Sequence, residues 1–239
     1  MIRLDLPLVV GHRGFPSRAV ENTMPSFEAA LDAGASGIEC DVRLTKDGAA
    51  AVFHDDSLNR LLGLEGAIER LPADVLPTLT FVGASAGIRI PLLEDVLAFV
   101  AERDALALVE LKADESTALD LARAALGAVE RTSTRGRVAF LSFSHGAVAA
   151  IRELAPAMPV GPIFERTPPL DAVTFHRTGW AVFEARAATR ELTRALAEAG
   201  VRAACYGVDD EAIDAELDAA GVGLRISDHT DRLVARRAR

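Results

Sequence analysis

Short apolar runs alternate with amphipathic, alanine- and glutamate-rich segments along most of the 239 residues. This alternation predicts an α/β fold, and a TIM (β/α)8 barrel fits the length of the chain. Most of the apolar runs are continuous, as is typical of parallel strands that helices cover. Because half of the residues are hydrophobic, one large core is possible, and we expect a single barrel domain over residues 1–239.

Nine segments have the pattern of strands: residues 8–11, 37–42, 49–53, 106–111, 138–141, 160–163, 180–183, 203–206 and 224–226. Six segments between them have the pattern of amphipathic helices, at residues 25–33, 92–102, 116–131, 145–154, 189–199 and 210–219. Pro25 suits the first turn of a helix, and Gly34 and Gly200 stand where helices should end.

A barrel of this type needs only eight strands, so one of the nine must be extra. The link at residues 43–48 is too short for a parallel crossover, which needs about a dozen residues. The residues from Thr45 to Gly48 have the composition of a turn. We therefore expect residues 37–42 and 49–53 to form a hairpin-like pair.

Residues 58–90 interrupt the alternation, because they hold two prolines and several glycines but no clear strand or helix. We expect an insertion that folds over one end of the barrel. The alternative is a loosely ordered loop, although long structureless loops are uncommon in compact domains.

The net charge of −9 argues against a nucleic-acid-binding surface, which normally has clustered lysine and arginine. The one basic run, Arg232 to Arg239, is expected to be a solvated tail, and the alternative is an anion-binding arm.

Cys40 and Cys205 lie in apolar runs and predict buried thiols in a reducing compartment. With no signal-peptide pattern and no membrane-spanning run, we expect a cytoplasmic protein without a stable membrane anchor. The oligomeric state is left open.

The first predicted strand ends in His12 and Arg13, and active sites of parallel barrels lie at the carboxyl ends of the strands. Histidine can move protons near neutral pH, and arginine offers a planar fork that fits phosphate. The alternative is a buried structural histidine beside a salt-bridged arginine.

The second strand carries Glu39 and Asp41, which share a face because side chains alternate along a strand. Two carboxylates aimed into a barrel repel each other, and a divalent cation would resolve that conflict. Oxygen ligands favour Mg²⁺ or Ca²⁺. The alternative is a pair of salt bridges to Arg13 and Lys112.

Further polar residues lie at the carboxyl ends of other predicted strands. His54 follows residues 49–53, and Glu110 and Lys112 lie two apart on residues 106–112. Glu110 could complete a site of three carboxylates, and Lys112 could face a phosphate as a point charge. Together with His12 this set suits phosphodiester cleavage, in which one histidine removes a proton and the other supplies one.

With these residues in place, the chain resembles the glycerophosphodiester phosphodiesterase family. The matching motifs, in the family's order, are His12-Arg13-Gly14, Glu21-Asn22-Thr23, Glu39-Cys40-Asp41, His54-Asp55, the segment from Ile90 to Val96, and Glu110-Leu111-Lys112. The resemblance implies a TIM barrel with a small insertion after the strand that ends in His54-Asp55. It implies hydrolysis of small-molecule glycerophosphodiesters, such as glycerophosphocholine, to glycerol 3-phosphate and an alcohol.

The resemblance also implies roles for individual residues. His12 and His54 would form the acid/base pair, and one cation, Mg²⁺ or Ca²⁺, would be held by Glu39, Asp41 and Glu110. Arg13 and Lys112 would contact phosphate, while Glu21 and Asn22 would shape the site near the first loop.

The second half of the chain departs from the family's pattern. The usual Trp-Thr-Val-Asn reads Tyr206-Gly207-Val208-Asp209, which keeps an aromatic wall at Tyr206 but leaves the alcohol specificity open. Phe140, Phe143 and Phe164 could line the rim, although phenylalanine in a barrel is more often core. The alternatives are another phosphodiester, such as a lysophospholipid, or a barrel that binds glycerophosphodiesters without cleaving them.

Overall fold

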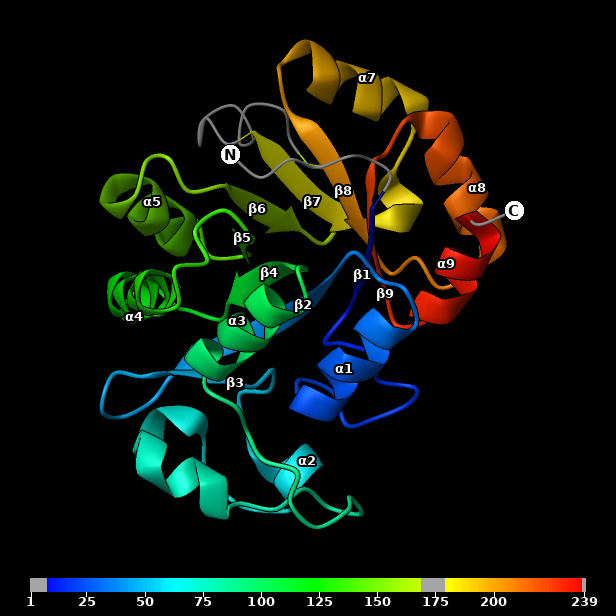
Figure 1. Cartoon of the computed structure of the whole chain (residues 1–239). Helices are drawn as coiled ribbons and strands as arrows, with labels where there is room; N and C mark the ends of the chain where they lie inside the picture. Colours follow the sequence, from blue (N-terminus) through cyan, green and yellow to red (C-terminus); the bar gives the residue numbers. More distant parts are fainter. Residues whose placement is uncertain (1–7, 169–178, 238–239) are drawn as a thin grey trace.

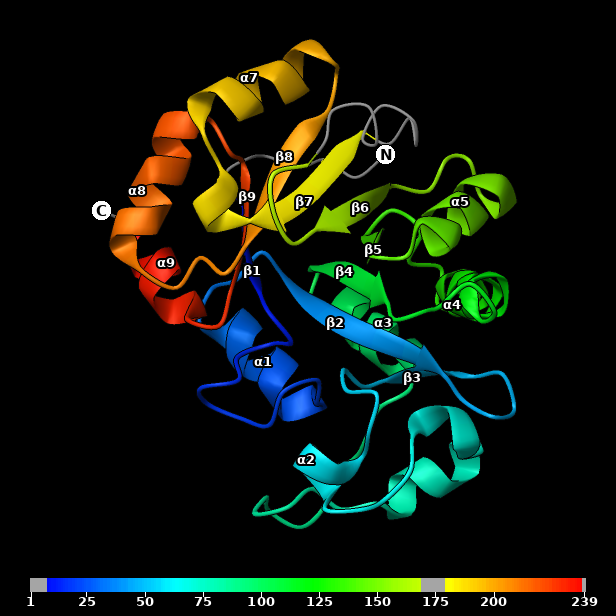
Figure 2. The same cartoon turned by 180° about the vertical axis from the view of Figure 1, so that it is seen from behind.

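The computed structural model describes residues 8–168 and 179–237. Its strands are β1 (Leu8–Gly11), β2 (Gly37–Leu44), β3 (Ala50–Val52), β4 (Leu106–Leu111), β5 (Val138–Ser142), β6 (Val160–Phe164), β7 (Trp180–Glu184), β8 (Arg202–Tyr206) and β9 (Leu224–Ser227). Its helices are α1 (Met24–Asp32), α2 (Asn59–Leu62), α3 (Leu93–Glu102), α4 (Ala118–Arg131), α5 (His145–Leu154), α7 (Arg190–Glu198), α8 (Glu211–Ala220) and α9 (Thr230–Arg237). The helices surround the strands on the outside (Figures 1 and 2).

The strands close into a barrel, as the sequence predicts. The order is β1-β9-β8-β7-β6-β5-β4-β2-β3, and the additional pairing of β1 with β2 closes the ring. All pairings between the eight barrel strands in the described residues are parallel. The carboxyl ends of the strands therefore meet at one end of the barrel.

The ninth strand, β3, lies outside the parallel ring. It pairs antiparallel with the end of β2, with Val42 opposite Val52, so the predicted hairpin is confirmed. The turn is closed by Thr45, whose Oγ1 donates to Asp47 at 2.6 Å and accepts from the backbone N–H of Ala49 at 2.8 Å. The strand therefore runs back from the carboxyl end of β2, and the backbone N–H of Phe53, directly after β3, donates to the carbonyl oxygen of Asp41 at 3.0 Å.

Two apolar layers give the barrel its stability. Inside, side chains from alternate positions of the strands form one cluster that includes Val10, Leu108, Leu141, Val182 and Ile226. Outside, the opposite faces of the strands pack on the helices in two larger clusters. Continuous apolar strands are required because both faces of each strand are buried.

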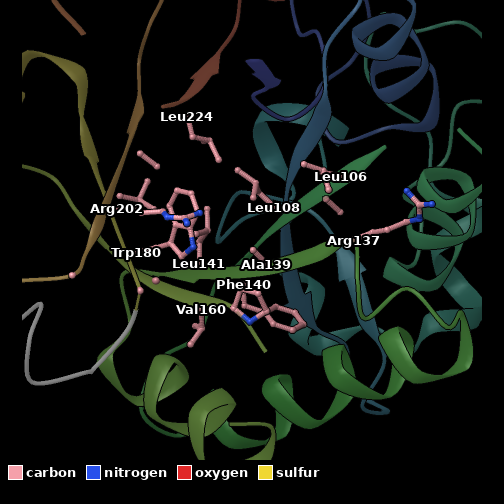
Figure 3. A pocket seen from close by; sticks show the side chains of 17 residues that line it. Leu106, Leu108, Arg137, Ala139, Phe140, Leu141, Val160, Trp180, Arg202 and Leu224 are labelled. Atoms are coloured by element: carbon pink, nitrogen blue, oxygen red, sulfur yellow. The ribbon is translucent and has the colours of Figure 1, made fainter. Parts of the chain in front are cut away.

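A cavity of about 310 Å³ lies at the amino ends of the strands (Figure 3). Its lining includes Leu106, Leu108, Trp180 and Arg202. Leu141 and Val182 line both this cavity and the pocket at the other end of the barrel. They therefore belong to the layer of inner side chains that separates the two ends.

Residues 58–90 form an ordered insertion, as expected, and not a loose loop. It contains α2 and two short 3-10 helices, Ile68–Arg70 and Ala73–Thr78. Its buried Leu62, Ile68 and Leu76 pack with residues of β3 in a cluster separate from the barrel core. In both views the insertion lies beside β3 (Figures 1 and 2).

The basic run at the C-terminus is not the solvated tail that the sequence predicts. Its described residues belong to α9, and Arg237 lies 3.2 Å from Asp214 and 2.9 Å from Asp218 of α8. Arg236 forms ion pairs with the same two aspartates of α8. The reason is the pair of carboxylates, Asp214 and Asp218, on which the buried Arg225 of β9 and the two arginines of α9 converge. No helix in the described part of the chain is long and apolar enough to cross a membrane.

Candidate active site

His12 and Arg13 follow β1 in a turn that two glycines make possible. A Cβ atom at Gly11 would lie 2.2 Å from the carbonyl oxygen of Gly14, and one at Gly14 would lie 2.6 Å from that of Ser26. Gly14 has a φ of +87°, in the left-handed region that favours glycine. The turn places His12 and Arg13 in the pocket at the carboxyl ends of the strands, where barrels of this type hold their active sites.

A carboxylate orients the ring of His12. Its Nδ1 lies 2.7 Å from Asp228 Oδ1, and its Nε2 lies 4.0 Å from Glu39 Oε2. Burial lowers the pKa of His12, but the hydrogen bond to Asp228 and the charge of Glu39 outweigh that effect and raise it. Asp228 is positioned in turn, because its backbone N–H donates to Asp209 at 3.1 Å.

Three buried carboxylates lie together at the same end of the barrel. Glu39 and Asp41 of β2 and Glu110 of β4 have side-chain oxygens within 4.8 Å of one another. Asp41 and Glu110 are partners in the parallel register of their strands, and Asp41 also accepts a hydrogen bond from Asn22 Nδ2 at 2.8 Å. Burial, together with the charge of Asp41, raises the pKa of Glu39 to about 8. A divalent cation would offset the repulsion between the three carboxylates.

Arg13 and Lys112 also approach the carboxylates. Lys112 Nζ lies 3.1 Å from Asp41 Oδ1 and 2.6 Å from Glu110 Oε1, and Arg13 Nε lies 3.3 Å from Asp41 Oδ2. The salt bridges expected as an alternative for Glu39 and Asp41 are therefore present for Asp41, and Lys112 pairs with Glu110 as well. Glu39, in contrast, has no lysine or arginine side chain as an ion-pair partner among the described residues, and accepts a hydrogen bond from the backbone N–H of Arg13 at 2.9 Å. Glu39 is thus the carboxylate of the cluster whose charge, when it is ionised, no lysine or arginine of the described residues offsets by an ion pair.

His54 follows β3 and is fixed at two points. Its Nδ1 lies 2.8 Å from Asp55 Oδ1. Its backbone carbonyl accepts hydrogen bonds from Nε and Nη2 of Arg43 at 3.0 and 2.8 Å, and Arg43 also contacts Glu69 of the insertion at 2.8 Å. Burial lowers the pKa of His54 below its usual value, although the charge of Asp41 opposes the change.

The pocket that these residues share has a volume of about 220 Å³. Its polar side is formed by His12, Arg13, Glu39, His54, Glu110 and Lys112, and its apolar side by Leu141, Phe143, Ile163, Val182, Tyr206 and Ile226. Tyr206 and Phe143 are thus the aromatic residues of this wall. Phe143 is 44% exposed at the rim, whereas Phe140 is fully buried in the outer core. This volume lies below the roughly 300–1,000 Å³ of pockets for drug-sized ligands, so it suits a small polar substrate.

A second group, formed by Glu21, His54 and Asp55, could also hold a metal by distance alone. The guanidinium of Arg60, in the insertion, already pairs with both carboxylates, at 2.7 Å from Glu21 and 2.6 Å from Asp55. Glu21 also lies 2.9 Å from Nη1 of Arg13. The negative charge of Glu21 and Asp55 is therefore offset by arginine side chains.

Sequence reasoning did not assign roles to Asp228, Arg43 or Arg60. Asp228 lies 216 positions from His12, so no local pattern shows that the two residues meet. The available signal was the position of Asp228 directly after the last strand, where barrels carry functional residues.

The model of the glycerophosphoryl diester phosphodiesterase family matches residues 12–232. Glycerophosphodiester phosphodiesterases of Bacillus altitudinis and Caldanaerobacter subterraneus are 37% and 31% identical to the chain, over 62% and 66% of its length. These alignments span 62% and 67% of the relatives' own lengths. A phosphodiesterase of Oleispira antarctica, solved in complex with the product sn-glycerol-3-phosphate, has a TM-score of 0.89 and 23% identity, with 98% of each chain covered. The extent of the family match shows that this chain belongs to the glycerophosphoryl diester phosphodiesterase family.

Proposed function

We propose that the protein hydrolyses glycerophosphodiesters to glycerol 3-phosphate and an alcohol. The observation that carries this proposal is the convergence of two histidines, two carboxylates, an arginine and a lysine on one small pocket, with the third carboxylate, Asp41, grouped with the other two behind it. The related phosphodiesterase that binds sn-glycerol-3-phosphate is consistent with a substrate that contains this group.

One divalent cation, Mg²⁺ or Ca²⁺, would be held by Glu39, Asp41 and Glu110. The three carboxylates fit such an ion because they offer only oxygen ligands, lie within 4.8 Å of one another and include a glutamate whose pKa is raised to about 8. When bound, the ion would stabilise negative charge on the phosphoryl oxygens.

The cationic side chains would bind the substrate phosphate. Arg13 and Lys112 both line the pocket and point toward the carboxylate cluster. The guanidinium can form two parallel hydrogen bonds to phosphate, whereas the ammonium acts as a point charge. Both would neutralise charge that grows in the transition state.

His12 and His54 would transfer the protons. One histidine would accept a proton from the nucleophile, which is water in the overall hydrolysis, and the other would donate a proton to the oxygen of the departing alcohol. Each ring has its Nδ1 against a carboxylate, Asp228 or Asp55. This pairing leaves the Nε2 atom of each ring available for the substrate.

The test is hydrolysis of glycerophosphocholine by the full chain. We expect release of glycerol 3-phosphate with Mg²⁺ or Ca²⁺, loss of activity with EDTA, and recovery when the ion is added back. If the protein cleaves no glycerophosphodiester with either ion, the proposal is wrong. Cleavage of a lysophospholipid would then indicate that the enzyme acts on another phosphodiester. Binding of glycerophosphocholine without cleavage would indicate a non-catalytic barrel.

A further inference from the structure

Arg60 connects the insertion to two loops of the barrel. It lies on α2, and its guanidinium forms four hydrogen bonds to two carboxylates. Nη1 and Nη2 donate to Glu21 at 2.8 and 2.7 Å. Nε and Nη2 donate to Asp55 at 2.6 and 2.8 Å. A planar guanidinium that engages two carboxylates through paired hydrogen bonds fixes their relative orientation.

Each of these carboxylates contacts a residue of the proposed active site. Asp55 Oδ1 lies 2.8 Å from His54 Nδ1, and Glu21 Oε1 accepts a hydrogen bond from Arg13 Nη1 at 2.9 Å. A continuous chain of contacts therefore runs from His54 through Asp55, Arg60 and Glu21 to Arg13. Its ends are a proposed proton carrier and a proposed phosphate ligand.

The contribution of Arg60 to overall stability should be small. Its side chain is 50% exposed, and ion pairs at exposed sites contribute little to folding. The pKa of Asp55 is nevertheless lowered, first by the hydrogen bonds from Arg60. The same hydrogen bonds hold the Asp55 carboxylate in place beside Nδ1 of His54.

We propose that Arg60 is a positioning residue for the active site: by clamping Asp55 and Glu21 it orients the ring of His54 and the guanidinium of Arg13. The insertion thereby supplies part of the active-site architecture. The effect of Arg60 on catalysis rests on the proposed function. The orientation of His54, in contrast, can be measured without turnover.

The first experiment compares steady-state hydrolysis of glycerophosphocholine by Arg60→Met, Arg60→Lys and a matched control, Arg131→Met. Arg131 is 59% exposed and pairs with Glu94 at 2.7 Å. The variant Arg131→Met therefore removes a similar ion pair outside the active site. We expect Arg60→Met to lower kcat about 10- to 100-fold, the loss that is typical when a residue that orients a metal-bound histidine is removed. Arg60→Lys should recover part of the loss, and Arg131→Met should match the wild type.

The second experiment asks whether Arg60 acts through Asp55. If it does, Arg60→Met should lower kcat much less in an Asp55→Asn background than in the wild type, because residues that act as a unit are non-additive. Equal losses in the two backgrounds, or a loss no greater than that of Arg131→Met, would overturn the proposal.

A third measurement is independent of activity. The Nδ1 proton of His54, hydrogen-bonded to Asp55, should give a downfield ¹H resonance that is assigned by its absence in His54→Asn. We expect this resonance to weaken or disappear in Arg60→Met and to persist in Arg131→Met. An unchanged resonance in Arg60→Met would refute the positioning role. If the wild type cleaved no glycerophosphodiester but the resonance still depended on Arg60, the proposed function would fail and the positioning role would stand.

Discussion

At the scale of single residues, the two proposed proton carriers are oriented in the same way but come from unrelated parts of the chain. His12 faces Asp228, and His54 faces Asp55, at 2.7 and 2.8 Å. A carboxylate on Nδ1 fixes the tautomer and the direction of an imidazole ring. Both rings therefore depend on a partner that does not itself transfer the reacting proton.

The pairing of His12 predicts the effect of Asp228→Asn. The substitution removes the charge that raises the pKa of His12 and lets the amide present a donor to Nδ1. We expect kcat for glycerophosphocholine to fall about 10- to 100-fold with little loss of stability. Asp231→Asn, which changes a neighbouring carboxylate that is 43% exposed and paired with Arg18, should have no effect. A turnover number for Asp228→Asn within twofold of the wild type would exclude this role.

The carboxylate cluster predicts the effect of Asp41→Asn. Asp41 is 1% exposed, and the asparagine keeps its size while removing one ligand charge. We expect the affinity for Mg²⁺ or Ca²⁺, measured by calorimetric titration, to fall at least about tenfold. Glu94→Gln, on α3 with a side chain that is 45% exposed, is the control. Unchanged affinity in Asp41→Asn would remove this residue from the metal site.

At the scale of elements, α9 is attached to the barrel by buried charge. Arg225 of β9 and Asp214 of α8 are both fully buried, with Arg225 Nε 2.8 Å from Asp214 Oδ1. Arg236 and Arg237 of α9 contact the same aspartate. Three arginines on two elements thus converge on one carboxylate of a third.

Removing that carboxylate should destabilise the protein strongly. Asp214→Ala would leave Arg225 buried without its main partner, so the free energy of unfolding in urea should fall by about 3–5 kcal/mol. Asp120→Ala, which removes an exposed carboxylate 3.4 Å from Arg123, should change it by less than about 1 kcal/mol. A similar small change in both variants would show that the charge cluster does not hold α9.

Most elements could be predicted from the sequence, and the bounds of the predicted strands and helices lie within two residues of the observed ones. Strands of a parallel barrel are visible as apolar runs because both of their faces are buried. The helix α9 could not be predicted in this way. Half of its eight residues are charged, and the ion pairs of Arg236 and Arg237 are made with Asp214 and Asp218 of α8, which no local pattern connects to them.

At the scale of the whole molecule, barrel closure builds the site. Gly11 of β1 and Ser227 of β9 are partners in the parallel register, so the next residues, His12 and Asp228, meet although they stand near opposite ends of the chain. The residue types that suit the chemistry could be recognised locally at strand ends. Their partners could not, because the contacts depend on strand register and on how the insertion packs.

The central claim is that His12 transfers a proton in the cleavage of a glycerophosphodiester, and one measurement tests it most directly. The release of glycerol 3-phosphate from glycerophosphocholine should be compared for the wild type and His12→Ala at saturating Mg²⁺ or Ca²⁺, with circular dichroism and thermal unfolding to confirm that the fold is retained. We predict that the folded variant has no measurable turnover while the wild type is active. A folded His12→Ala variant that releases glycerol 3-phosphate at the wild-type rate would contradict the claim.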